Sequence, residues 1–324
     1  MNLFSKEGNK LATYNLRLFI RWAKILLNKS YYHQQQSLGR AFIKDKVHGY
    51  FNDLTGKTNW NGMLDTEGIP YNILANGKKI YFPTTIIQMA LGYYDRWIIE
   101  KDPYYYKQFI KLTDWIVAKQ DENGGWDVWT ETGLKYDSVY SAMTQGEAIS
   151  LLSRAWLNTG NDEYRESAFQ AFKVMIKPVE EGGTTIYEGD DVYLEECPLI
   201  ERNTILNGWI FALFGLYDFS IAFKSSQALD LLNQSLNTLS KSLLLFDANY
   251  WSYYDLRKNI ASPFYHALHI EQLKALSIIN PLGPWEGYCK KWIAYQNNPR
   301  NKFRAIVKKG YQKILDPGEA VIIK

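Results

Sequence analysis

The chain has 324 residues, of which 46% are hydrophobic and 22% are charged. This composition excludes disordered and collagen-like chains and predicts one large globular domain, or at most two. A formal charge of +3, from 37 basic and 34 acidic side chains, excludes the strongly basic character of a dedicated nucleic-acid binder. Aromatic residues make up 15% of the chain, which is more than a core needs and suits ring-lined carbohydrate clefts.

The two cysteines, Cys197 and Cys289, lie far apart in the sequence, and neither has a second cysteine at metal-ligand spacing. With only four histidines, this pattern argues against both a zinc knuckle and a disulfide framework, and we expect no metal site.

The N-terminus has no apolar run followed by a small-residue cleavage site, so the sequence predicts no standard secretion signal. Residues Leu16–Leu27 are apolar but interrupted by three basic side chains, and they are shorter than the roughly 20 residues of a membrane-spanning helix. They predict an amphipathic helix that packs on the domain or touches a membrane surface or a partner. We therefore expect a cytoplasmic protein without a transmembrane segment, and leave open peripheral attachment at the inner membrane and a homodimer.

The chain divides into a helical arm at 1–49, a catalytic domain at 50–297 and a tail at 298–324. An irregular stretch rich in Gly, Asn and Thr is expected up to Gly77, and a repeated plan of paired helices follows it. Gly160 fits the C-terminal cap of one helix, and Asn161 or Asp162 fits the N-cap of the next. The predicted pairs are Pro83–Ile99 with Tyr104–Lys119, Ala142–Asn158 with a helix from Asp162 to about Ile176, Leu206–Phe223 with Ser226–Leu245, and Phe264–Ile279 with Pro284–Tyr295.

Four helical hairpins, about sixty residues apart, indicate a repeat architecture. Such pairs cannot bury their apolar faces alone and must stack, either as an open solenoid or curled into an (α/α) toroid. The connections are Asp121–Asp137, Glu180–Asn203 and Phe246–Ser262, and we expect the first two to form short β-hairpins that line a cleft. The fold class is therefore mainly α, and ligand chemistry is expected at these connections.

The third connection carries candidate chemistry. Ser262 is a good N-cap and Pro263 a good first helical residue, so Tyr265 lies in the first turn, where the helix dipole makes a phenol easier to ionise. His269 follows one turn later on the same face. Arg257 can donate two N–H bonds to a carboxylate, as in an acid-sugar site. The alternative is that the tyrosine and histidine are core residues and the arginine belongs to a surface ion pair.

The second connection ends in an acidic run, residues 190–196. Strand alternation places Glu196 on the face of Val192 and Leu194, where desolvation raises the pKa of a carboxyl group and improves it as a base. The alternative is a solvated hairpin. The glycine-rich run at Asn123–Trp126 predicts a turn, and the motifs of serine hydrolases, P-loops, zinc proteases and dinucleotide folds are missing from the sequence.

Read together, these segments resemble the C-terminal catalytic domain of the D-glucuronyl C5-epimerases, enzymes that convert glucuronate to iduronate within heparan-type chains. The resemblance covers roughly residues 80–297 and implies an (α/α) toroid. It is carried by the blocks Tyr81–Gly92, Tyr140–Ser150, Leu206–Gly208 with Gly215–Asp218, Tyr254–Arg257 and Tyr265–Ile270.

The resemblance also implies roles for individual residues. The matching positions give the catalytic candidates Glu196, Tyr265, Tyr254 and Arg257, and the site as a whole gives the substrate-binding candidates His266, His269, Tyr193, Cys197, Gln145 and Trp126. Where the animal enzymes have Glu-Tyr-Pro, this chain has Glu196-Cys197-Pro198, so one phenol is missing. The β-rich N-terminal domain and membrane anchor of the animal enzymes are not matched, which implies a minimal bacterial version.

The function predicted on this basis is C5-epimerisation of a polymeric hexuronate by two proton-transferring residues, with no metal or other cofactor and with a uronate-containing polysaccharide as partner. A polysaccharide lyase is the nearest alternative, because it begins with the same C5 proton abstraction. Two further alternatives are a glycoside hydrolase, which needs two carboxylates flanking the glycosidic bond, and a catalytically silent glycan-binding protein, which needs none. Carboxylates available to a hydrolase are Asp127, Asp190, Glu195 and Glu196.

Overall fold

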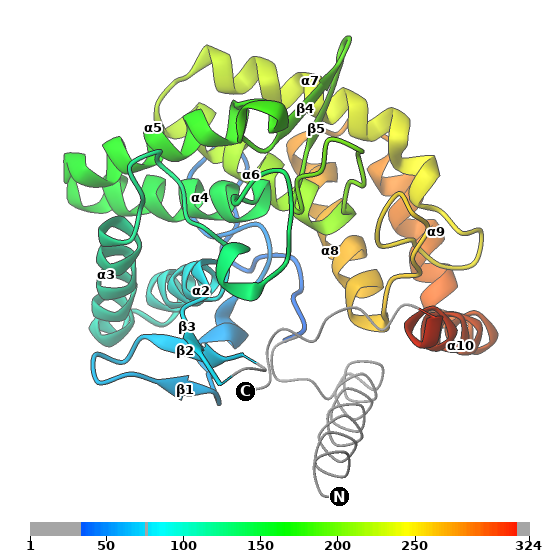
Figure 1. Cartoon of the computed structure of the whole chain (residues 1–324), viewed down its shortest axis with the longest axis horizontal. Coiled ribbons are helices and arrows are strands. Elements are labelled where there is room, and N and C mark those ends of the chain that lie inside the picture. The colour runs from blue at the N-terminus through cyan, green and yellow to red at the C-terminus, as the bar shows by residue number, and fades with distance from the viewer. Residues whose placement is uncertain (1–33, 75–76, 316–324) are drawn as a thin grey trace, which may run out of the picture.

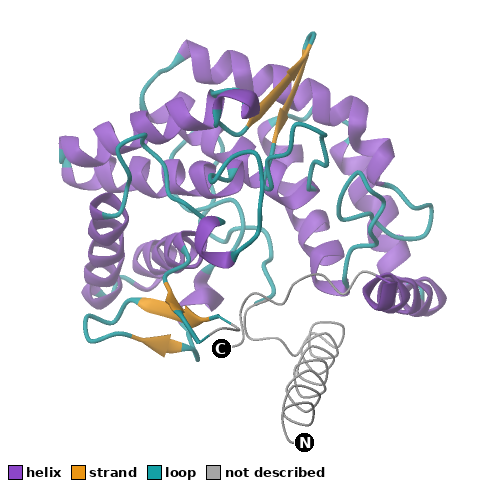
Figure 2. Cartoon of the chain, in the orientation of Figure 1, coloured by secondary structure: helices purple, strands orange, loops and turns teal. Residues whose placement is uncertain are grey.

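The computed structural model describes residues 34–74 and 77–315, and this part of the chain is mainly helical (Figure 2). The predicted apolar helix at Leu16–Leu27 lies outside the described residues. Within the described part, eight helices form four hairpins, as the sequence predicts. They are α2 (Pro83–Glu100) with α3 (Pro103–Ala118), α4 (Ala142–Thr159) with α5 (Asp162–Ile176), α6 (Leu206–Ala222) with α7 (Ser226–Ser242), and α8 (Pro263–Ile279) with α9 (Trp285–Asn297).

The helix ends follow the capping signals in the sequence. The side chain of Ser262 accepts a hydrogen bond from the backbone N–H of Tyr265, and that of Asn161 accepts one from Glu163. Gly160 has a φ of 70° and ends α4. Helix α7 stops at Ser242, before the predicted end, because its last turn tightens into the 3₁₀ helix η4 (Leu243–Phe246).

The hairpins follow one another round an arc, with α2, α4, α6 and α8 packed side by side (Figure 1). Helices α4 and α6 approach each other closely, since a Cβ added to Gly215 would lie 2.4 Å from the Cα of Gly146. Two glycines therefore allow the backbones of these helices to touch. The expected mainly α fold, an (α/α) toroid of stacked hairpins, is confirmed.

Residues 34–60 connect the two ends of the arc. The N–H of Leu38 donates to Glu271 on α8 (2.9 Å), and the N–H of Tyr50 donates to Asp95 on α2 (3.0 Å). The ring of Phe51 stacks on Phe214 of α6 at 4.2 Å. The segment continues into the 3₁₀ helix η1 (Thr55–Thr58), which packs on α2. Residues 34–49, expected as part of a helical arm, contain no helix and pack into the toroid.

A buried arginine anchors this segment. Arg154 on α4 donates to the carbonyl oxygens of His48 (2.8 Å) and Gly49 (3.1 Å), and it pairs with Asp218 of α6 at 2.5 Å. Both charged side chains are almost fully buried. Since a buried charge is costly unless it is paired, this cluster fixes α4, α6 and the segment relative to each other.

The β structure is limited to two small sheets in the described residues. Strands β4 (Thr185–Glu188) and β5 (Asp191–Leu194) form the hairpin predicted for the second connection. A three-stranded antiparallel sheet, β1 (Met63–Leu64), β2 (Pro70–Ile73) and β3 (Lys79–Ile80), occupies the stretch expected to be irregular.

The hairpin expected in the first connection does not form. Between Asp121 and Asp137 the described chain has turns and the 3₁₀ helix η2 (Thr130–Thr132), with no strand. The carboxylate of Asp121 accepts from the N–H groups of Asn123 and Gly125, and that of Asp127 accepts from Trp129 and Thr130. These local bonds satisfy backbone donors that a strand ladder would need.

Helix α10 (Pro299–Leu315) occupies most of the expected tail and packs on α9 and α8, where Ala305 is buried. In the part of the chain that the structure describes, every helix is too short or too polar to cross a bilayer.

Candidate functional site

A cavity of about 270 Å³ lies where the N-terminal ends of the inner helices α2, α4, α6 and α8 converge. Helix N-termini carry partial positive charge, so this end of the toroid favours an anionic ligand. The remaining wall comes from residues 34–60 and from the first two connections. The lining includes Lys57, Trp60, Thr84, Gln88, Trp129, Thr144, Glu196, Asn207, Phe264, Tyr265 and Leu268.

Glu196 reaches the cavity at the first turn of α6. The amide of Asn207 donates to its Oε2 at 3.4 Å. A Cβ on Gly208 would lie 2.2 Å from that oxygen, so the carboxylate occupies space that only a glycine leaves free. Burial raises the pKa of Glu196 to about 7, and the neighbouring carboxyl of Glu195 contributes. A carboxyl group with this pKa can accept and return a proton at neutral pH.

Tyr265 lines the same cavity from the first turn of α8. Its ring packs against that of Tyr254, with centroids 4.8 Å apart. Tyr254 is fixed by its backbone, because its N–H donates to Asn259 at 2.6 Å and its carbonyl accepts from Leu206 at the start of α6. Burial, followed by the charge of Glu196, raises the pKa of Tyr254 well above its usual value. Tyr254 is therefore a neutral hydrogen-bond donor.

Three of the predicted residues, Tyr254, Arg257 and Cys197, are not among those that line the cavity, although Tyr254 contacts Tyr265, which does. Arg257 has an exposed side chain, its N–H donates to Asn203 (3.0 Å), and its charge acts on the hydroxyl of Tyr136. Cys197 is half-buried, and its side chain lies next to the hydroxyl of Tyr136. Burial raises the pKa of the Cys197 thiol well above its usual value, so the sulfur stays protonated.

The two predicted histidines are buried beneath the cavity. Both rings bond the hydroxyl of Ser252, through Nδ1 of His266 at 2.8 Å and Nδ1 of His269 at 2.9 Å. The ring of His266 also stacks on Trp251 at 3.8 Å. Burial lowers the pKa of His266 to about 3 and that of His269 well below its usual value. Neither ring has exposed surface, and the contacts of both rings support the third connection and α8.

The other three substrate-binding candidates are also core residues. Gln145 donates to the carbonyl of Ala171 at 3.2 Å, and the indole of Trp126 donates to Ile116 at 2.9 Å. Tyr193 packs on Trp209 at 5.3 Å. All three predicted residues are buried and none lines the cavity, so direct contact with a ligand is not supported.

Sequence reasoning missed a second polar group at the cavity. The amide of Gln88 on α2 donates to both carboxyl oxygens of Glu147 on α4 (2.9 and 3.2 Å), and Lys57 faces this pair. Burial raises the pKa of Glu147 to about 8 and lowers that of Lys57 to about 8. The sequence contains a signal for two of these residues. Gln88 and Glu147 are polar residues at positions that the helical periodicity assigns to the core. Lys57 carried no such signal, because it lies in an irregular segment.

Helix α10 adds another cation that the sequence did not indicate. The amine of Lys309 lies over the ring of Tyr254, 5.6 Å from its centroid, and burial lowers the pKa of Lys309 to about 8. Within residues 34–74 and 77–315, no three His, Cys, Asp or Glu side chains lie close enough together to hold a metal ion.

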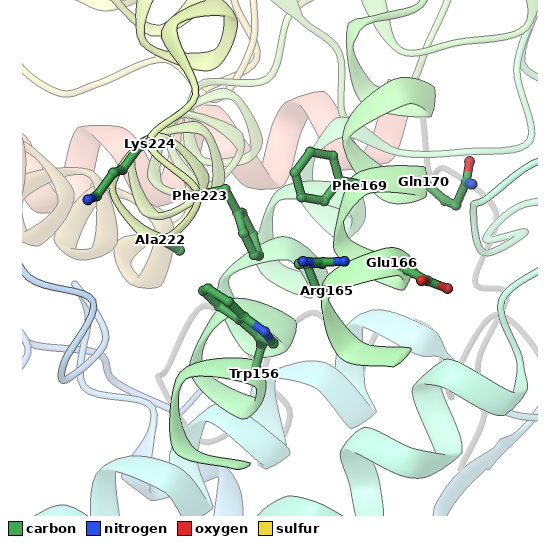
Figure 3. Close-up of a pocket in the computed structure, with 8 residues that line it drawn as sticks. All are labelled: Trp156, Arg165, Glu166, Phe169, Gln170, Ala222, Phe223 and Lys224. Carbon is green, nitrogen blue, oxygen red and sulfur yellow. The ribbon is translucent and has the colours of Figure 1, made fainter. Parts of the chain in front are cut away.

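A second pocket, of about 570 Å³, lies at the C-terminal ends of α4 and α6 (Figure 3). Figure 3 shows Trp156, Phe169 and Phe223 gathered around Arg165, and the rings of Trp156 and Phe223 are 5.0 Å apart. The pocket contains none of the predicted site residues.

Residues 120–294 match the family model described as the C-terminus of D-glucuronyl C5-epimerase. The chain belongs to the D-glucuronyl C5-epimerase C-terminal family. The match includes Glu196, Tyr254, Arg257 and Tyr265, and it ends before α10. This membership confirms the family predicted from the sequence.

Two relatives of this epimerase-family chain illustrate how far the similarity extends. It is 29% identical over 219 residues to the D-glucuronyl C5-epimerase of Caenorhabditis elegans, covering 60% of this chain and 36% of that protein. It is 31% identical over 157 residues to an uncharacterized protein of Methanocaldococcus jannaschii, covering 47% of this chain and 50% of that one. The matched region thus spans half or less of each relative.

Solved structures of unsaturated glucuronyl hydrolases have a distant similarity to this member of the epimerase family. The enzyme from Bacillus sp. GL1 gives a TM-score of 0.44 at 16% identity, covering 70% of this chain and 62% of that one. The enzyme from Streptococcus agalactiae gives a TM-score of 0.45 at 16% identity, covering 68% of this chain and 58% of that one.

Proposed function

We propose that this protein inverts the configuration at C5 of hexuronate residues within a polysaccharide, of the D-glucuronate to L-iduronate type. One observation carries the proposal: Glu196 and Tyr265, which come from different parts of the chain, line one cavity at the positive ends of the inner helices. Family membership supports the same reaction class.

The chemistry requires charge stabilisation. The C5 hydrogen of a uronate lies α to a carboxylate, so its removal builds a second negative charge on a group that is already anionic. Four helix N-termini around the cavity offset part of that charge. Arg257 binds the carboxylate, and the neutral phenol of Tyr254 donates a hydrogen bond to the enediolate.

Inversion further requires a base on one face of the sugar ring and an acid on the other. Glu196, with its pKa raised to about 7, is the group that can carry a proton from the side of α6. Tyr265 carries the other proton from α8. In one direction Glu196 removes the C5 proton and Tyr265 delivers one to the opposite face, and in the other direction the two residues exchange roles.

The test is incorporation of solvent deuterium at C5 of a panel of glucuronate-containing polysaccharides, with chain length measured in the same samples. The proposal expects deuterium at C5, formation of the epimer and unchanged chain length. Unsaturated ends would identify a lyase, new reducing ends a hydrolase, and binding without exchange a glycan-binding protein.

A further inference from the structure

The loop that leads into α4 lies alongside the segment that carries Glu196. The N–H of Ala142 donates to the carbonyl of Glu195 (2.9 Å), and the N–H of Asp137 donates to that of Pro198 (2.9 Å). The carboxylate of Asp137 accepts from the N–H of Ile200 at 2.7 Å. These three bonds hold the residue before Asp137 next to Cys197.

That residue is Tyr136, and its side chain is held between two parts of the site. Its ring packs edge-on against Trp129, which lines the cavity, with centroids 4.9 Å apart and planes inclined by 66°. Its hydroxyl lies next to the side chain of Cys197 and within electrostatic reach of Glu196 and Arg257. One hydroxyl thus lies among three of the candidate site residues.

We propose that Tyr136 is a further substrate-contacting residue, whose hydroxyl donates a hydrogen bond to the uronate carboxylate next to Arg257. The inference rests on the proposed function and adds a residue to the same site. A thiol is a weak hydrogen-bond donor, so Cys197 cannot supply a strong bond at this position. The phenol of Tyr136, which approaches from the first connection, can supply a strong bond there.

The protonation state of Tyr136 agrees with this role. Burial and the contact with Cys197 raise the pKa of its hydroxyl above the usual value, while Arg257 acts in the opposite direction. Tyr136 is therefore neutral at physiological pH and acts as a donor rather than as a base. Trp129 fixes the ring, so little side-chain freedom is lost when the substrate carboxylate binds.

The test compares C5 deuterium exchange by the wild type and by Tyr136→Phe, which keeps the ring against Trp129 and removes only the hydroxyl. A hydrogen bond to a charged group predicts a fall in kcat/KM of about 10- to 100-fold. The matched control is Tyr104→Phe, an exposed tyrosine on α3, which should keep wild-type exchange. Wild-type kcat/KM in Tyr136→Phe would overturn the inference.

A swap of the two side chains provides a second measurement. Tyr136→Cys combined with Cys197→Tyr returns a phenol to the same contact from the other segment, and it should be more active than Tyr136→Cys alone. No recovery in a double variant with the wild-type melting temperature would overturn the donor role. If the wild type itself exchanges no deuterium, the proposed function fails first and this role fails with it, so the two failures are distinguishable.

Discussion

The ring of Tyr254 packs against the ring of Tyr265, with centroids 4.8 Å apart and planes inclined by 58°. One tyrosine comes from the third connection and the other from the first turn of α8. The contact places Tyr254, a neutral hydrogen-bond donor, against Tyr265, whose phenol lines the cavity. Removing one hydroxyl should therefore affect the reaction without disturbing the packing of the rings.

Tyr265→Phe should abolish most of the exchange and preserve polymer binding, because it loses only the hydroxyl. General acid–base catalysis is typically worth about 10²- to 10⁴-fold in rate. Deuterium incorporation measures the loss, and binding of the polysaccharide by titration calorimetry checks that the site is intact. If the rate of the variant stays within a few-fold of the parent, Tyr265 does not transfer the proton.

Arg257→Lys should raise KM even though it keeps the positive charge, because an ammonium group cannot reproduce the planar pair of N–H donors. The matched control is Arg304→Lys on α10, where the guanidinium lies over the ring of Tyr250, 3.9 Å from its centroid. Unchanged KM and turnover in Arg257→Lys would place this arginine among the surface ion-pairing residues.

The pH dependence should follow the ionisation of Glu196. In the direction in which Glu196 removes the proton, the rate should rise as the pH passes through about 7, because only the ionised carboxylate is a base. Glu195→Gln removes a neighbouring charge that raises the pKa of Glu196, so the rise should move to lower pH. An exposed substitution, Glu201→Gln, is the control. A profile that does not move would assign the ionisation to another group.

Gly208→Ala should inactivate the protein although it removes no chemical group. The added Cβ would lie 2.2 Å from Oε2 of Glu196, so the carboxylate must leave its position or α6 must shift. Overpacking of this kind costs typically about 1–3 kcal/mol of stability. Gly287→Ala on α9 is a matched control, because no atom lies within 4 Å of its added Cβ. Exchange rate and melting temperature are compared, and wild-type exchange by Gly208→Ala would contradict the placement of Glu196.

Cys197→Ser should keep exchange within a few-fold of the parent. Burial raises the pKa of the thiol, so little thiolate is available as a proton carrier, and serine preserves the size of the side chain. Thiol alkylation should accordingly be slow at neutral pH, with Cys289→Ser used to remove the second thiol. Loss of turnover in Cys197→Ser, with fold and polymer binding intact, would make the sulfur a participant in the reaction.

The paired helices were predictable from the sequence because their signals are local. The periodicity of Ala142–Asn158 and the Ser262-Pro263 cap each act within one or two turns, and the structure places α4 and α8 accordingly. The expected hairpin at Asp121–Asp137 was wrong because carboxylates there bond the backbone of their own turns.

The assembly of the site was harder to predict, since it depends on contacts between distant segments. Local signals singled out Tyr265 at a helix start and Glu196 after a strand, and the resemblance to a family added their roles, but no spacing rule places the two at one cavity. Lys57 and Tyr136 were missed because both lie in irregular segments, where side-chain direction is decided by tertiary packing. Gln145 and Trp126 have residue types suited to a site, but the helices around them leave both almost fully buried.

Arg154 fixes the carbonyl groups of His48 and Gly49 at one end of the inner helices, and the same segment reaches the cavity at the other end with Lys57 and Trp60. The part that holds the segment in place is thus separate from the part that meets a ligand. Under the proposed function, substitutions at positions 57 and 60 are expected to alter substrate preference while the anchor at Arg154 stays intact. This separation makes the segment a suitable place to redesign substrate preference without rebuilding the toroid.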